Sequence, residues 1–113
     1  MNTDAVIAEL GLRLPEGARV VGASSSNEGD GLIRAKLEMP PAQVSRFVAS
    51  AKIEGLEDTE PDVLGPDEGF WEPHHAKRLR YGQTQLSGAR FLHVAIDESR
   101  PETAVVYVML HGT

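Results

Sequence analysis

Apolar residues occupy every second position from Ile33 to Met39, and charged residues fill the positions between them. A period of two predicts a β-strand over residues 32–39 with one apolar face and one solvated face. Residues 18–24 form a second, mostly apolar run, and a polar loop rich in serine and glycine joins the two. Two strands connected in this way predict a β-hairpin. Within the loop, Gly29-Asp30-Gly31 lacks the spacing and the lysine of a phosphate-binding motif, so we expect an ordinary turn there.

The best-defined helical pattern covers residues 41–52. Pro41 suits the first position of this helix, because its missing N–H has no partner there in any case. A shorter helix is predicted over residues 4–10, ending before Gly11. Spacings of three and four place one apolar stripe on the longer helix, made of Val44, Phe47, Val48 and Ala51.

Three further strands are predicted near the end of the chain, at residues 79–86, 90–97 and 104–110. Their short connections are typical of an antiparallel meander. The 113 residues fall within the size of one domain, so we expect residues 1–113 to form a single unit. The expected fold class is α+β, with a single antiparallel five-stranded sheet, the element order α-ββ-α-βββ, and one main helix packed on one face.

Periodicity is lost between Glu54 and Glu72, a stretch rich in acids that contains no lysine or arginine. Proline and glycine interrupt it repeatedly, so we expect a long irregular loop, and such loops inside compact domains are usually functional or disordered. Trp71, near the end of the loop, has two interpretations. It either folds back to cover the core or serves as the aromatic anchor of an interface.

Composition narrows the possible partners. A net charge of −6 argues against nucleic acid, which needs a basic stripe, and favours a basic protein. The absence of cysteine excludes disulfides and thiolate sites. We find neither a signal sequence nor an apolar run of the roughly 20 residues that span a bilayer, so we expect a cytoplasmic protein.

The histidines prompt a test for metal and for acid–base chemistry. Neighbouring His74 and His75 point to opposite sides of an extended backbone and cannot easily share one ion. His93 and His111 lie on neighbouring predicted strands and share a face only if the strand register allows it. The spacings of known zinc sites are absent, so we expect no metal and no cofactor. A small-ligand or metal-dependent enzyme remains an alternative, with Glu72, His74 and His75 as acid–base groups and Asp67 or Glu68 nearby.

A resemblance adds a second line of argument. It rests on Leu14-Pro15-x-Gly17-Ala18-x-Val20-Val21, on Leu37-Glu38-Met39-Pro40-Pro41 before a helix, on Trp71-x-Pro73, and on Val105-Val106-Tyr107. With these motifs the chain resembles a family of small bacterial proteins of unknown function, including actinobacterial ones, many of which are lipoproteins. The resemblance implies no catalytic residue. It leaves a lipoprotein-like domain of the cell envelope as another alternative, although this chain shows no lipobox cysteine.

The leading hypothesis is a non-catalytic interaction protein, and within that class an immunity-type inhibitor of a basic toxin or enzyme. We expect the acids of the irregular loop to steer the partner and the aromatic pair at its end to anchor it. The expected partner-binding residues are Glu57, Asp58, Glu60, Asp62, Phe70 and Trp71.

Overall fold

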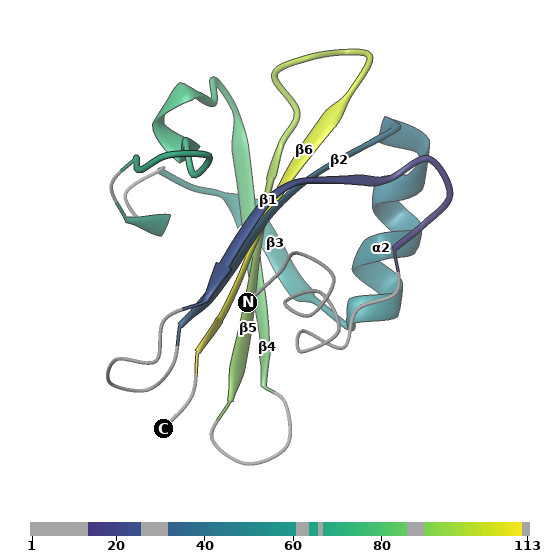
Figure 1. Ribbon diagram of the computed structural model, residues 1–113. Coiled ribbons are helices and arrows are strands. Elements are labelled where there is room, and N and C mark those ends of the chain that lie inside the picture. Colours follow the sequence, from purple (N-terminus) through teal and green to yellow (C-terminus); the bar gives the residue numbers. More distant parts are fainter. Residues whose placement is uncertain (1–13, 26–31, 61–63, 66, 86–89, 112–113) are drawn as a thin grey trace.

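One six-stranded antiparallel sheet organises the molecule (Figure 1). The computed structural model describes residues 14–25, 32–60, 64–65, 67–85 and 90–111. Across the sheet the strands run in the order β1-β2-β6-β5-β4-β3, so the last strand lies in the middle, between β2 and β5. The strands are β1 (Arg19–Ser25), β2 (Ile33–Met39), β3 (Glu54–Asp58), β4 (Leu79–Gln85), β5 (Phe91–Asp97) and β6 (Ala104–His111).

The α+β class and the antiparallel pairing are confirmed, and each of the five predicted strands is present to within about one residue at either end. The hairpin of β1 and β2 and the meander of β4, β5 and β6 also form as expected. The strand count was wrong. Residues 54–58, assigned to an irregular loop, form the strand β3, so the order of the described elements is ββ-α-ββββ. The predicted helix over residues 4–10 and the Gly29-Asp30-Gly31 turn lie outside the described residues.

One face of the sheet, here called the helix face, packs against the predicted main helix. A 3₁₀ turn at Pro41–Gln43 leads into α2 (Val44–Ala51), and Pro41 takes the first position as expected. Lys52 ends the helix in the left-handed conformation, with a φ of 58°. The stripe of α2 buries Phe47 against the alternate residues of β2, β5 and β6 that point to this face. These residues form the larger core cluster and include Leu37, Leu92, Val94, Ile96, Val106 and Val108.

The strand β3 can form because Gly82 of β4 has no side chain. A Cβ at Gly82 would lie 2.7 Å from Cγ2 of Ile53 and 2.9 Å from the carbonyl oxygen of Glu54, closer than real contacts allow. Glycine inside a strand often marks such a close approach of another backbone. The interruption that Gly82 introduces into the alternation of β4 is therefore the feature that admits the sixth strand.

The other face of the sheet is covered by irregular chain. Residues 64–65 and 67–76, here called the strap, lie across it and include a 3₁₀ turn at Pro73–His75 (Figure 1). Arg34, Lys36 and Glu38 of β2 point to this strap face, with side chains only 14–22% exposed. The expected solvated face of β2 was therefore wrong, because the strap covers it. None of the helices in the described part of the chain is long and apolar enough to cross a membrane.

The central position of Phe47 gives a direct test of this core. Its side chain is 1% exposed, so Phe47→Ala should lower the free energy of unfolding by about 3–5 kcal/mol, the usual loss for a truncated buried aromatic. Chemical denaturation measures the loss. Ser45→Ala, on the exposed side of the same helix, is the control and should change stability by less than about 0.5 kcal/mol. A loss below about 1 kcal/mol for Phe47→Ala would contradict the packing described here.

Candidate functional site

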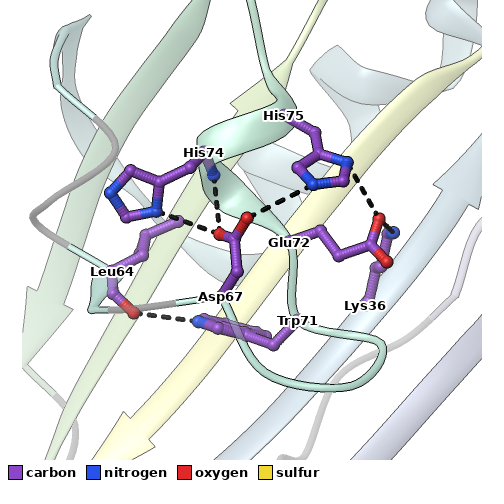
Figure 2. Close-up of polar contacts among 7 residues, drawn as sticks. All are labelled: Lys36, Leu64, Asp67, Trp71, Glu72, His74 and His75. Atoms are coloured by element: carbon purple, nitrogen blue, oxygen red, sulfur yellow. Dashed lines mark hydrogen bonds and ion pairs between the residues drawn. The ribbon is translucent and has the colours of Figure 1, made fainter.

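Trp71 is the centre of the strap face. It is 1% exposed, and its ring stands edge-on against Tyr107 of β6, with the ring centroids 5.1 Å apart. The indole Nε1 donates a hydrogen bond of 2.8 Å to the carbonyl oxygen of Leu64 (Figure 2). The guanidinium of Arg34 lies over the indole ring at 5.3 Å. The structure agrees with the first interpretation of Trp71, in which the residue folds back and covers the core, because its side chain is not on the surface.

Phe70 extends the same cover toward the edge of the sheet. It is half-buried and lies against Gly22 of β1, where a Cβ would come within 2.5 Å of the Phe70 ring. The two aromatic residues together reach from β1 to β6. Both were expected to bind a partner, but the structure uses both to attach the strap to the sheet.

A polar cluster on the strap, here called the latch, joins Asp67, Glu72, His74 and His75 to Lys36 of β2 (Figure 2). Asp67 accepts one hydrogen bond from the backbone N–H of His74 and also contacts Nδ1 of the His74 ring, both at 2.9 Å. His75 lies between two carboxylates, with Nε2 at 3.4 Å from Asp67 and Nδ1 at 3.3 Å from Glu72. Glu72 is also 3.8 Å from Nζ of Lys36, which ties the cluster to the sheet.

Chemically, the latch is an array of imidazole–carboxylate pairs. We expected Glu72, His74 and His75 to lie together from the sequence, and they do, with Asp67 between the rings of His74 and His75. Glu68 is directed elsewhere and pairs with Arg34 at 3.8 Å. The backbone N–H of His74 lowers the pKa of Asp67 below its usual value, and the two histidine side chains add to the effect. These contacts close the strap onto itself and onto β2, which is a structural role.

The carboxylates along the edge strand β3 form a second candidate site. Glu54, Glu57 and Asp58 lie on β3, and Glu60 lies two residues beyond its end. All four are exposed and are here called the acidic edge. Within the described residues, Asp58 has one ion-pair partner, Arg78 at 3.9 Å, and the three glutamates have none. A groove of about 320 Å³ runs beside the edge, and Tyr81 and Gln83 of β4 form its other wall. Asp62, the remaining acid of the expected surface, lies outside the described residues.

Four rings form a third feature, a ladder across the strap face. Ala95 of β5 and Tyr107 of β6 are register partners on the strap face. Because side chains alternate along a strand, the next pairs on this face are His93 with Met109 and then Phe91 with His111. His93 stacks on His111, with ring centroids 4.7 Å apart. Tyr81 also stacks on His93, and Phe91 stacks on His111. The register that His93 and His111 needed to share a face is therefore present.

His93 is the one residue of the ladder that is almost fully buried, at 8% exposed. Burial lowers its pKa from the usual value, and the neighbouring His111 lowers it further. Nδ1 of His93 is hydrogen-bonded to the hydroxyl of Tyr81, whereas Nε2 is buried and has no hydrogen-bond partner among the residues that the structure describes. Within the described residues, no group of three or more histidine, cysteine, aspartate and glutamate side chains is placed to hold a metal ion.

The sequence analysis did not predict the strap because it inferred a solvated face from the alternation within β2 alone. The signal was present in the last strand, where the residues from Ala104 to Leu110 are apolar without alternation. A short continuous apolar run is typical of a strand that is buried on both faces. Such a strand in the middle of the sheet requires a second covering layer, and the only tryptophan of the chain is the largest side chain able to provide it.

The role of Trp71 predicts a loss of stability on truncation. Trp71→Ala should lower the free energy of unfolding by about 3–5 kcal/mol. Trp71→Phe keeps a ring in place but leaves the Leu64 carbonyl without its donor, which costs about 1–3 kcal/mol for an unsatisfied buried group. Denaturant titrations would measure both values, with the exposed Glu60→Gln as control. Wild-type stability of Trp71→Ala would mean that the strap does not need its tryptophan.

The latch predicts a specific pH dependence. Because the pKa of Asp67 is lower in the folded protein than the ordinary value of 3.8, its ionised form stabilises the fold. That contribution is complete above pH 3.8 and is lost as the pH falls through the folded-state pKa. Asp67→Asn should therefore melt below wild type at pH 6, and the gap in melting temperature should narrow below pH 4. Glu102→Gln, an exposed acid distant in sequence, should keep the wild-type profile, and an unchanging gap for Asp67→Asn would contradict this role.

Comparisons with known proteins add no relative to this description: no family model, curated protein or solved structure matches the chain.

Proposed function

We propose that this protein is a non-catalytic interaction protein that binds a basic protein partner through the acidic edge. Within that class we propose an immunity-type inhibitor, which neutralises a basic toxin or enzyme. The observation that carries the proposal is the set of exposed glutamates at the acidic edge, which have no cationic partner among the described residues.

The negative charges of the acidic edge act mainly on the rate of association with the partner. The resulting potential extends about 8 Å at physiological ionic strength and steers an oppositely charged protein toward that edge. The acids of the strap contribute less, because Asp67, Glu68 and Glu72 each face a histidine, arginine or lysine within 4 Å. The acidic segment of the sequence thus divides into a strap whose charges are paired internally and an edge whose charges are available.

The geometry of β3 favours side-chain contacts over the addition of a partner strand. The strand has five residues, and its pairing with β4 is irregular between Glu54 and Glu57. Short, bulged and charged strands are the devices that protect a sheet edge from pairing with another chain. The partner is therefore expected to present lysine or arginine side chains rather than an extended backbone.

The groove beside the acidic edge provides a place for one such side chain. Its volume of about 320 Å³ is at the lower end of the range for ligand pockets. Glu54, Glu57 and Asp58 border the groove on the side of β3, and the half-buried Tyr81, the register partner of Glu57, borders it on the side of β4. A cation seated between carboxylates and an aromatic ring gains both ion pairing and cation–π attraction. This groove replaces Phe70 and Trp71 as the proposed anchor point.

Binding kinetics test the proposal once a tagged copy of the protein has captured its partner from the source organism. Neutralising the acidic edge with Glu54→Gln, Glu57→Gln, Asp58→Asn and Glu60→Gln should slow association about tenfold or more at low salt. It should also flatten the dependence of the association rate on ionic strength.

A matched pair of double variants locates the effect. Glu57→Gln with Glu60→Gln, and Glu16→Gln with Glu102→Gln, remove the same net charge from exposed positions. The first pair should slow association and the second should change it much less. An acidic partner, equal effects of the two pairs, or a wild-type rate for the quadruple variant at low salt would refute the proposal.

A further inference from the structure

The stacked rings on the strap face bring an unusual set of side chains together. His93 of β5 is the direct register partner of Met109 on β6, and His111 follows Met109 by two residues on the same face. Directly opposed residues of an antiparallel pair have Cβ atoms about 4.5–5.5 Å apart, and diagonal neighbours are within reach of long side chains. Two imidazoles and one thioether therefore share one small area of the sheet.

The state of His93 is the second observation. This residue is more than nine-tenths buried, and within the described part of the chain its Nε2 has no hydrogen-bond partner. A buried polar atom left without a partner is costly and calls for an explanation, such as a bound water or ion. Nδ1 is held by the hydroxyl of Tyr81, which in turn lies 3.4 Å from Oε1 of Gln83. When Tyr81 donates to Gln83 and accepts Nδ1–H of His93, Nε2 keeps a free lone pair.

We propose that His93, His111 and Met109 form a binding site for monovalent copper. A thioether is a soft ligand that favours soft metal ions such as Cu(I), and imidazole is also a good ligand for copper. The three side chains include no carboxylate, which makes the site unsuited to Mg²⁺ or Ca²⁺. The hydrogen bond from Nδ1 to Tyr81 matches the support that metal-binding histidines usually have, because it orients the ring and fixes which nitrogen faces the ion.

Binding requires one local movement. The planes of His93 and His111 are within 16° of parallel, so their in-plane lone pairs do not converge on one point. His111 is half-buried and near the end of β6, where its ring can turn while His93 stays fixed by Tyr81. The ion then replaces ring stacking as the link between the two histidines. The ligands of this site are distinct from the carboxylates of the acidic edge, and Tyr81 borders both features.

Competition with a chromophoric Cu(I) chelator under anaerobic, reducing conditions tests the site. The purified protein should bind one Cu(I), and the nitrogen resonances of His93 and His111 should shift in NMR spectra. Met109→Leu conserves size and apolar character but removes the sulfur, and should weaken Cu(I) binding by at least about tenfold. Tyr81→Phe keeps the ring and removes the supporting hydroxyl, and should weaken binding about 10–100-fold, the usual effect of losing such support.

Controls separate the site from other ligands and from loss of fold. His74→Gln with His75→Gln removes the other two histidines and should leave Cu(I) affinity unchanged. Melting curves without metal should show that Met109→Leu and Tyr81→Phe remain folded. The proposal is overturned if no 1:1 complex forms, if Met109→Leu binds Cu(I) like wild type, or if the double histidine variant loses binding. Equal competition by Zn²⁺ would also overturn it, because a zinc site would not need the thioether.

Discussion

The ring of Trp71 fills the space above Tyr107, and the need to fill that space arises from the two central strands. β5 and β6 bury side chains on both faces, so the sheet requires a covering layer on each side. The amphipathic helix α2 covers one face through regular periodic packing. The strap covers the other with few apolar side chains. Trp71 is the largest of them, and its hydrogen bond to Leu64 and the contact of Phe70 with Gly22 support it.

The charges of the molecule are organised around this irregular layer. Lys36 and Arg34 of β2 lie beneath the strap, where each is close to an aromatic ring and to a carboxylate. A cation in that position is partly removed from water, so a nearby acid and a ring face compensate for its lost hydration. The acids of the strap are thus engaged by the fold. The acids of β3 face water, and this difference separates a structural set of carboxylates from one that is available to a partner.

Residues on the strap face of the sheet contribute to three features: the strap contact, the groove of the acidic edge and the stacked histidines. Tyr107 receives the strap, Tyr81 borders the groove of the acidic edge and also holds His93, and Met109 extends the apolar surface toward the stacked histidines. Burial raises the pKa of both tyrosines above its ordinary value. The proposed copper site and the proposed docking edge therefore meet at Tyr81, although each depends on different charged or ligating groups.

Local sequence determined the regular elements, because their periodicity is a property of neighbouring residues. The sequence predicted the strand from Ile33 to Met39, the apolar stripe on residues 41–52 and the three late strands. It also predicted the proximity of Glu72, His74 and His75. Only the tertiary structure decided that β6 lies between β2 and β5, since pairing between distant strands depends on which faces must be covered. That placement buries both faces of β6, draws Trp71 inward, and leaves the acids of β3 outward. It also sets His93 beside His111, a contact that depends on the register of two strands and that no local pattern specifies.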